Sequence, residues 1–365
     1  MGQRVLIIGG GGRIGRSVAA DLLQHTEVTM TLTGRRSQPD FALHPRQRYQ
    51  RLSLDNQAGL GDAIAQHDLV IHCAGPFRTR DLTVLTQCIE QKTPYIDVAD
   101  SPDYVDKALA LGTAAAAAGV TCILSTGVFP GISNSMVRQG IEQLDQADHV
   151  HLSYLVAGSG GAGVTVMRTT FIELLTPFTA RVNGQTAMIQ PYSEREVLPF
   201  PEPYNHGAGV YWFNTVEALT LARSFPQLSS VITKFGSLPD LYNRLTGLMT
   251  LLPPAWLKRS VEFLSQVSYA MTQVTDRFSG TGIAIRLEIK GQHQGQPATY
   301  LAMGTHSDTA EAAGYGTGSV AQLLLSGQLT KPGIWSVEQA LPTGLFEQTL
   351  AERELTINRS INIHS

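Results

Sequence analysis

Cysteine is scarce in this sequence, and its three copies lie far apart. Cys73, Cys88 and Cys122 are odd in number, and no pair of them has the spacing of metal ligands. Disulfide frameworks use an even set of cysteines, and zinc sites use closely spaced pairs, so the sequence favours neither. We expect no metal site, and we expect the three thiols to be small buried apolar groups in a reducing compartment.

Long apolar runs and a leader segment are missing as well. A membrane-spanning helix needs about 18 or more successive apolar residues, but the nearest candidate, residues 238–257, contains two charges and Pro253-Pro254. We interpret it as a broken amphipathic helix, which leaves open a peripheral membrane contact, a cover over a substrate pocket or a dimer interface. The chain enters an apolar segment directly after Arg4 without a signal peptide, so we expect a cytoplasmic protein.

Charge is modest and nearly balanced. The formal net charge is -3, and charged residues make up 16% of the chain against 43% hydrophobic residues. This composition excludes a disordered chain and provides no basic field that would attract nucleic acid. Arginines gather only at Arg35-Arg36 and at Arg46, Arg48 and Arg51. We interpret the second group as a solvated surface loop.

The apolar residues that are present follow an alternating strand and helix pattern over the first third of the chain. Short apolar runs that end in turn residues are typical of strands buried on both faces of a parallel sheet. The predicted strands cover residues 5–8, 28–32, 68–73, 95–98 and 120–124. The predicted helices cover residues 13–24, 82–91 and 102–119. This alternation predicts an α/β fold with a doubly wound parallel sheet.

The pattern changes after about residue 130. A length of 365 residues favours two domains, and a longer strand is expected at residues 149–157. Asn183-Gly184 is a strong hairpin signal within residues 181–189, and a second hairpin is expected within residues 283–303. These elements predict a second α+β domain with a mostly antiparallel sheet. Helices are expected again at residues 310–325, 337–341 and 345–352.

A glycine-rich loop joins the first predicted strand to the first predicted helix. Its Gly10-x-Gly12-x-x-Gly15 pattern, in that position, indicates a dinucleotide site. The first glycine permits a tight turn, the second lets the backbone approach a pyrophosphate, and the third lets the helix pack close to the strand. The helix N-terminus offers N–H groups to the phosphates; the alternative is a turn without a ligand. The expected cofactor-binding residues here are Gly10, Gly11, Gly12, Arg13, Ile14 and Gly15.

The end of the second predicted strand indicates which cofactor fits. NAD enzymes usually carry an acid there for the ribose 2′-hydroxyl, whereas arginine accommodates the 2′-phosphate of NADP. This chain has Gly34-Arg35-Arg36 and no acid, so we expect NADP(H) bound by these residues. The alternative is a pair of ordinary surface arginines. Asp55, which lies between the strands predicted at residues 28–32 and 68–73, is expected either to contact the adenine or to cap the next helix.

The glycine loop and Ala74-Gly75-Pro76-Phe77 are two of five segments whose order and spacing match a known family. The others lie at residues 34–35, 95–100 and 127–134. Together the segments resemble the saccharopine dehydrogenase/reductase-like family of NADP-dependent oxidoreductases, and residues 307–355 are similar more loosely. The resemblance implies that Ala74, Gly75 and Pro76 line the pyrophosphate and nicotinamide side of the cleft. Their place at the carboxyl end of a central strand agrees with this.

The resemblance also implies a domain organisation. A Rossmann domain that binds NADP would cover residues 1–130, and a substrate and dimerisation α+β domain would cover residues 131–307. The C-terminal helices, within residues 308–365, would pack back on the first domain. A homodimer with a small-molecule substrate is the expected assembly.

Residues 125–134 depart from the members of that family that form saccharopine. Those members carry acidic residues in this segment that grip an amino-acid substrate, whereas here it is neutral and partly apolar. We therefore expect NADPH-dependent reduction of a C=N, C=O or activated C=C bond in a small, partly apolar metabolite. The alternatives are an opine-type reductase that joins an amino acid to a keto acid, and a non-catalytic protein that senses NADP(H).

Catalytic residues are harder to assign from the sequence. Tyr95 and Asp97 share one face of a predicted strand near its carboxyl end, where they would reach the cleft; for Asp97 a structural anchor is the alternative. Arg168 follows a second glycine-rich loop, residues 158–163, and would bind a carboxylate, unless it is a surface residue beside a turn. His206 and His306 are loop histidines that suit proton donation near neutral pH, or surface and capping roles.

Overall fold

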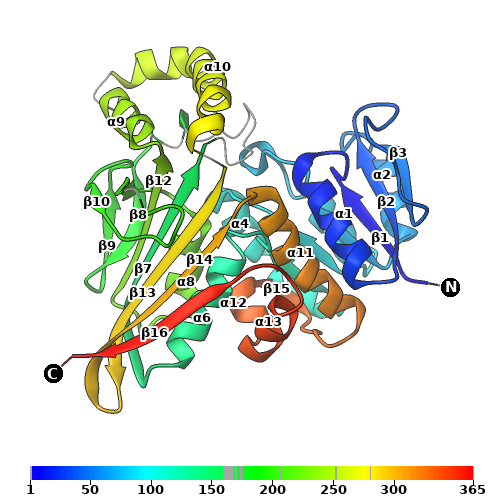
Figure 1. Cartoon of the computed structure of the whole chain (residues 1–365). Helices are drawn as coiled ribbons and strands as arrows, with labels where there is room; N and C mark the ends of the chain where they lie inside the picture. Colours follow the sequence, from blue (N-terminus) through cyan, green and yellow to red (C-terminus); the bar gives the residue numbers. More distant parts are fainter. Residues whose placement is uncertain are drawn as a thin grey trace. The chain divides into compact units, whose positions relative to one another are not determined.

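The protein, seen here in a computed structural model, forms two compact units. The first contains Met1–Ser135 and Ala310–Glu354, and the second contains Met136–Thr309 and Leu355–Ser365. Figure 1 shows the course of the chain through both. The structure describes residues 2–158, 168, 171–172, 174, 176–205, 207–250, 253–279 and 281–364.

The first unit is built on a seven-stranded parallel sheet. Its strands are β1 (Arg4–Ile8), β2 (Thr29–Gly34), β3 (Gln47–Arg51), β4 (Leu69–His72), β5 (Tyr95–Asp97), β6 (Thr121–Leu124) and β15 (Gly333–Ser336). Their order is β15-β6-β5-β4-β1-β2-β3, and each neighbouring pair runs parallel. The inner strands β4 and β6 are buried along their whole length, as expected for short apolar runs covered on both faces. The predicted doubly wound sheet is confirmed.

Helices connect these strands (Figure 1). They are α1 (Arg13–His25), α2 (Gln57–Ala65), the 3-10 helix η1 (Phe77–Thr79), α3 (Thr83–Glu90), α4 (Pro102–Leu109) and α5 (Gly112–Ala118). The single helix predicted over residues 102–119 is wrong, because the chain breaks between α4 and α5. Leu111 N–H donates there to the carbonyl of Ala108, three residues back, at 3.0 Å. This tighter turn ends one helix before the next begins.

The arginine-rich segment at residues 46–51 is not a loop. Most of it forms β3, which pairs with β2 at the edge of the sheet. Its side chains are exposed or half-buried, so composition alone resembles a solvated loop. The interpretation as a surface loop is therefore wrong, although Arg48 and Arg51 are exposed.

The C-terminal part of the first unit contains α11 (Thr309–Leu325), α12 (Val337–Ala340) and α13 (Thr343–Leu350). Glycines let α11 pack closely on the rest of this unit. A Cβ on Gly314 would lie 2.8 Å from the backbone of Ser17, and one on Gly318 would lie 1.9 Å from the carboxylate of Asp21. Helix α1 and helix α11 therefore pack together through positions that admit only glycine on α11.

The second unit contains a seven-stranded mixed sheet in the order β10-β11-β12-β7-β13-β14-β16. Only β12 and β7 pair in parallel among these strands, and the other pairs are antiparallel. The mostly antiparallel sheet is thus confirmed, and β8 with β9 forms the hairpin predicted at Asn183-Gly184. The strands are β7 (Gln146–Ala157), β8 (Phe178–Val182), β9 (Gln185–Ile189), β10 (Glu196–Val197), β11 (Gly209–Trp212), β12 (Ser230–Leu238), β13 (Gly282–His293), β14 (Gln296–His306) and β16 (Ile357–Ile363).

Helices of the second unit include the region for which a broken helix was predicted. The structure has α9 (Asp240–Met249) and α10 (Pro254–Ser279) there, besides α8 (Val216–Ser224), while α6 (Ile132–Glu142) carries the chain from one unit to the other. The break is confirmed. Among the described residues, no helix has both the length and the apolar character needed to cross a bilayer.

The C-terminal part of the chain contributes to both units. Residues 310–354, with the C-terminal helices, belong to the first unit, whereas β16 pairs with β14 in the sheet of the second unit. The alternating sequence of Ile357–Ile363 suits an edge strand. Its pairing with β14 is not indicated by the helical periodicity of the residues around it.

Candidate functional site

The glycine loop between β1 and α1 lies at the carboxyl edge of the first sheet. Gly10 N–H donates to the carbonyl of Ile7 at 3.0 Å, which closes the turn after β1. Gly11 N–H donates to the Thr33 carbonyl at 3.1 Å, and Gly9 N–H donates to the Thr33 hydroxyl at 3.2 Å. The protein itself therefore fixes the shape of the loop against the end of β2.

Most glycines of this loop have no room for a side chain. A Cβ on Gly9, where φ is +79°, would lie 2.8 Å from the backbone nitrogen of Ala74, and one on Gly10 would lie 2.9 Å from β2. A Cβ on Gly15 would lie 2.5 Å from the Gly9 carbonyl. Gly12 differs, since its Cβ would meet only the Gly9 carbonyl, at 3.2 Å. The outer side of Gly12 is thus open to a ligand.

The first turn of α1 is suited to an anion. Gly12 caps the helix without a side-chain hydrogen bond, and the first turn contains no acidic residue. The N–H groups and partial positive charge of a helix start are then not neutralised by the protein. Arg13 is exposed and Ile14 half-buried in that turn. A dinucleotide pyrophosphate fits here, because a Cβ at Gly12 would fill the space that it approaches.

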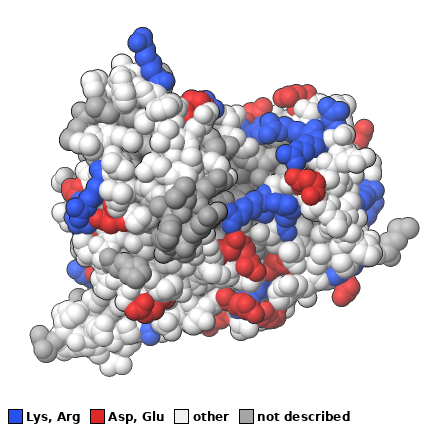
Figure 2. Space-filling view, turned by 45° about the horizontal axis from the view of Figure 1, so that its top comes forward, with Lys and Arg blue, Asp and Glu red and all other residues white. Residues whose placement is uncertain are grey.

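Arg35 and Arg36 follow β2 and are exposed. Arg36 Nη1 donates to Asp40 Oδ2 at 2.5 Å, with side chains 73% and 59% exposed, and this hydrogen bond holds the pKa of Asp40 below its usual range. Exposed pairs of this kind are weak, so a phosphate can compete with Asp40. Figure 2 shows that Lys and Arg side chains gather on part of the molecular surface.

Tyr49 is a residue of this site that the sequence pattern did not indicate. A Cβ on Gly34 would lie 2.3 Å from the Tyr49 hydroxyl, and one on Gly11 would lie 3.3 Å from its ring. The hydroxyl donates to the Arg36 carbonyl at 3.3 Å. Tyr49 therefore packs between the glycine loop and the arginine pair, and Gly34 is needed to admit its ring. The sequence feature that could have indicated this contact is the presence of a tyrosine within the arginine-rich segment at residues 46–51.

Asp55 lies after β3 and is exposed. The hydroxyl of Ser53 donates to Asp55 Oδ2 at 3.2 Å. The cap of α2 is Asn56, whose Oδ1 accepts from Gly59 N–H at 3.1 Å. A capping role for Asp55 is therefore wrong, and its contact with adenine stays a prediction.

Residues 73–76, which follow β4, lie against the glycine loop. β1 and β4 are neighbours, and the strand order changes direction there, which is where doubly wound sheets bind ligands. Arg80 holds this segment, because its Nε donates to the Ala74 carbonyl at 2.8 Å and its Nη2 to the Gly75 carbonyl at 3.2 Å. The Gly75–Pro76 peptide bond is cis. Ala74, Gly75 and Pro76 thus lie beside the loop that would hold the pyrophosphate.

Tyr95 and Asp97 are completely buried at the end of β5. The Tyr95 hydroxyl donates to Asp97 Oδ2 at 2.9 Å, and Asp97 Oδ1 accepts from Ala99 N–H at 3.0 Å and Ser125 N–H at 2.7 Å. Burial raises the pKa of Asp97 to about 6 and that of Tyr95 well above its usual range. Because both side chains are committed to partners inside the protein, the geometry favours anchoring of the loops after β5 and β6 over contact with a substrate.

The remaining candidates lie in the second unit. Arg168 forms an exposed ion pair with Glu262, Nε to Oε2 at 3.7 Å, so its charge already has a partner. His306 is buried, and its Nδ1 lies 2.7 Å from the carbonyl oxygen and 3.0 Å from the backbone nitrogen of Asp308. His206 and residues 159–163 of the second glycine-rich loop lie outside the described residues.

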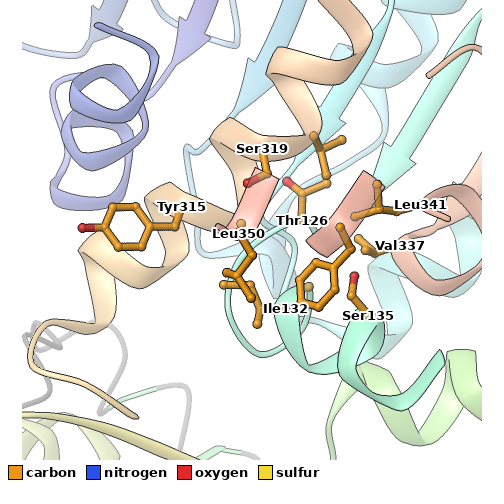
Figure 3. A pocket seen from close by; sticks show the side chains of 12 residues that line it. Thr126, Ile132, Ser135, Tyr315, Ser319, Val337, Leu341 and Leu350 are labelled. Atoms are coloured by element: carbon orange, nitrogen blue, oxygen red, sulfur yellow. The ribbon is translucent and has the colours of Figure 1, made fainter. Parts of the chain in front are cut away.

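The segment at residues 125–134 follows β6 at the same edge of the first sheet. Asn134 Nδ2 donates to Glu338 Oε2 at 2.8 Å, and its Oδ1 accepts from Gly131 N–H at 2.9 Å, all buried. Behind it lies a cavity of about 10 Å³, lined partly by Thr126 and Ser135, which is about the size of one water. Figure 3 shows Tyr315, another lining residue, with its ring turned away from the other labelled side chains. This cavity is too small for a substrate.

Comparison with known proteins adds to this geometry. Residues 5–123 match the family model of the saccharopine dehydrogenase NADP binding domain, which confirms the resemblance over that segment. The chain is also similar to saccharopine dehydrogenase (L-Glu forming) from Saccharomyces cerevisiae, with 12% identity, a TM-score of 0.69 and coverage of 98% of this chain and 100% of that one.

Two further solved structures share the fold. DAP dehydrogenase from C. glutamicum, in complex with DAP, has 16% identity and a TM-score of 0.52 over 96% of this chain and 99% of that one. An engineered D-amino acid dehydrogenase bound to NADP+ has 14% identity and a TM-score of 0.51 over 97% of this chain and 100% of that one. At such identities these similarities show the fold. Taken with the family model, which shows a saccharopine dehydrogenase-type NADP binding domain over residues 5–123, they support an NADP(H)-dependent oxidoreductase.

Proposed function

We propose that the protein transfers hydride from NADPH to a C=N, C=O or activated C=C bond of a small, partly apolar metabolite. The observation that carries this proposal is the neutral segment at residues 125–134, which lies at the carboxyl edge of the sheet that holds the nucleotide loop. It contains no Asp, Glu, Lys or Arg, and it is mostly buried. A zwitterionic substrate needs charged or hydrogen-bonding partners when it leaves water, so this segment favours a substrate with fewer charges.

Different residues of the first unit would bind different parts of the cofactor. Gly10 to Gly15 and the start of α1 bind the pyrophosphate, while Arg35 and Arg36 bind the 2′-phosphate. Ala74, Gly75 and Pro76 line the nicotinamide side, where Arg80 fixes the backbone. Bound NADPH supplies the hydride, and the protein supplies position and electrostatics. A fixed nicotinamide raises the rate because the reacting carbon no longer has to be oriented.

The assembly is proposed from the same resemblance. The second unit would carry the substrate pocket and the contact of a homodimer, in the cytoplasm. A peripheral membrane contact through residues 238–257 is the other use of this region, because Leu241, Leu245 and Leu248 expose 57%, 36% and 63% of their surface on α9. Light scattering and liposome flotation distinguish the two. A dimer that stays out of the lipid fraction supports the first, and a monomer that floats supports the second.

The experiment that tests the proposed reaction uses NADPH deuterated at the transferred position. The protein is incubated with single representatives of cyclic imines, ketones, enones, and amino acid plus keto acid pairs, and deuterium in the product is measured by mass spectrometry. We expect transfer to a neutral imine, ketone or enone. Transfer only to the amino acid plus keto acid pair would contradict the proposal and favour opine-type chemistry. A protein that binds NADPH but transfers deuterium to none of these classes would contradict it as well.

A further inference from the structure

A charged groove on the sheet of the second unit has no part in the proposed reaction. It encloses about 570 Å³, which is within the size range of small-molecule pockets, roughly 300–1,000 Å³. It lies over β13, β14 and the end of β16. Arg286, Glu288 and Lys290 of β13 are among the residues that line it.

Arg286 is a buried cation in this groove. Arg286 is only 6% exposed, and its Nη2 donates to Glu288 Oε2 at 2.6 Å. Its Nε and Nη1 are buried and have no hydrogen-bond partner among the described residues. A buried donor without an acceptor costs about 1–3 kcal/mol, and more when it is charged. A hydrogen-bond acceptor that the described residues do not provide would therefore stabilise these N–H groups.

The surroundings of Arg286 leave an excess of positive charge. Glu288 is shared, because Lys290 Nζ lies 3.4 Å from its Oε1 while Arg286 binds its Oε2. One carboxylate thus faces two cations. Ser153 lies opposite Arg286 on β7, and its buried hydroxyl also has no hydrogen-bond partner among the described residues. β12, the strand that pairs with β7 on its other side, contributes Lys234. The charge of Lys234 is already matched by Glu196, with Nζ 2.5 Å from Oε1.

We propose that this groove is a binding site for a small oxyanion, either a carboxylate or a phosphate monoester. Its oxygens accept hydrogen bonds from the unpartnered N–H groups of Arg286, and Lys290 at the rim adds attraction. Guanidinium is suited to such anions because its planar donors match their oxygens. Arg286 and Lys290 carry two positive charges and Glu288 carries one negative charge. A ligand with one negative charge therefore makes this cluster neutral. The recessed arginine and the polar rim favour a small ligand over the apolar patch that a stable interface between copies needs.

The test is isothermal titration calorimetry on the full chain, with saturating NADP+ present so that the nucleotide site does not compete. The probes are inorganic phosphate and succinate. We expect one-to-one binding of at least one probe, and the tighter one names the class of ligand. Arg286→Met should weaken that binding at least tenfold. Glu288→Gln should tighten it several-fold, because it removes the carboxylate that competes for the same guanidinium.

Two controls keep the result interpretable. Arg244→Gln removes an exposed arginine of α9 and should leave the affinity unchanged. If Arg286→Met does not fold, as judged by its melting temperature, Glu288→Gln alone decides. Absence of binding by the wild type, or an affinity that Glu288→Gln leaves unchanged or lowers, would overturn the proposal. So would a dimer that dissociates on Arg286→Met, since the acceptor would then come from a second copy.

Discussion

Arg353 and Asp21 form a bidentate ion pair in the interior of the first unit, although 332 residues separate them in the sequence. Arg353 Nε donates to Asp21 Oδ1 at 2.8 Å and its Nη2 donates to Oδ2 at 2.7 Å. The two side chains are 0% and 1% exposed. The pair joins the segment after α13 to α1, the helix whose N-terminus would hold the pyrophosphate.

Asp21→Ala should destabilise the protein strongly. Removing one partner of a buried ion pair leaves the other charge uncompensated, at a cost of about 3–5 kcal/mol. Chemical unfolding followed by fluorescence measures the free energy of unfolding. The matched control is Asp40→Ala, which breaks an exposed pair with Arg36 and should cost less than about 1 kcal/mol. Equal effects of the two substitutions would show that the buried pair does not hold the C-terminal segment.

Gly12→Ala should impair nucleotide binding while the protein stays folded. The new methyl group would meet only the Gly9 carbonyl, at 3.2 Å, and it would occupy the side that faces the pyrophosphate. We expect NADPH to bind at least tenfold more weakly, with a small change in melting temperature. Gly344→Ala is the control, because a Cβ there has no neighbour within 4 Å. Unchanged NADPH affinity in Gly12→Ala would place the pyrophosphate elsewhere.

Asp97→Asn should change the pH dependence of stability. Burial raises the pKa of this carboxyl to about 6 from 3.8, so the folded state keeps the proton to higher pH than the unfolded state. The stability that the protonated form contributes is complete below pH about 4 and is lost as the pH rises to about 6. By pH about 7 the loss reaches about 3 kcal/mol, at 1.36 kcal/mol per pKa unit.

The amide of Asp97→Asn keeps an oxygen for the Ala99 and Ser125 N–H groups and carries no charge. The free energy of unfolding of this variant, relative to the wild type, should therefore increase between pH about 4 and about 7. Asp97→Ala, which removes the acceptor, should destabilise the protein at every pH. A difference between Asp97→Asn and the wild type that stays constant with pH would contradict this account of the buried carboxyl.

Asp40→Asn should improve the binding of NADPH. Asp40 accepts a hydrogen bond from Arg36, so its charge would both compete with the 2′-phosphate for this arginine and repel it. We expect NADPH affinity to rise several-fold at low salt, less at high salt because exposed charges are screened, and NADH affinity to stay the same. Fluorescence titration measures both. A similar gain for NADH would mean that Asp40 acts on a part of the nucleotide that the two cofactors share.

The sequence predicts the first sheet well for a physical reason. Its inner strands are apolar runs because both faces are covered, and that pattern is local. β3 escapes prediction because its residues are polar, and its pairing with β2 makes it a strand. Tyr49 is missed together with it, although its ring packs beside the glycine loop.

Long-range contacts account for most of what the sequence does not predict. Nothing in the local pattern around Asp21 or Arg353 indicates that the two side chains meet. The parallel pairing of β7 with β12 and the unpartnered donors of Arg286 likewise depend on which strands become neighbours. The glycine loop could be recognised because its function depends on residues adjacent in sequence. The anchoring role of Asp97 could not, because it depends on the N–H of Ser125, which is distant in sequence.

The measurement that tests the central claim most directly is the selectivity of the wild type and of Arg35→Glu for NADPH over NADH, by fluorescence titration at fixed ionic strength. If Arg35 and Arg36 recognise the 2′-phosphate, the wild type binds NADPH at least tenfold more tightly than NADH. Arg35→Glu should then remove most of this preference, with little change for NADH. An unchanged ratio in the variant would show that these arginines do not select the cofactor.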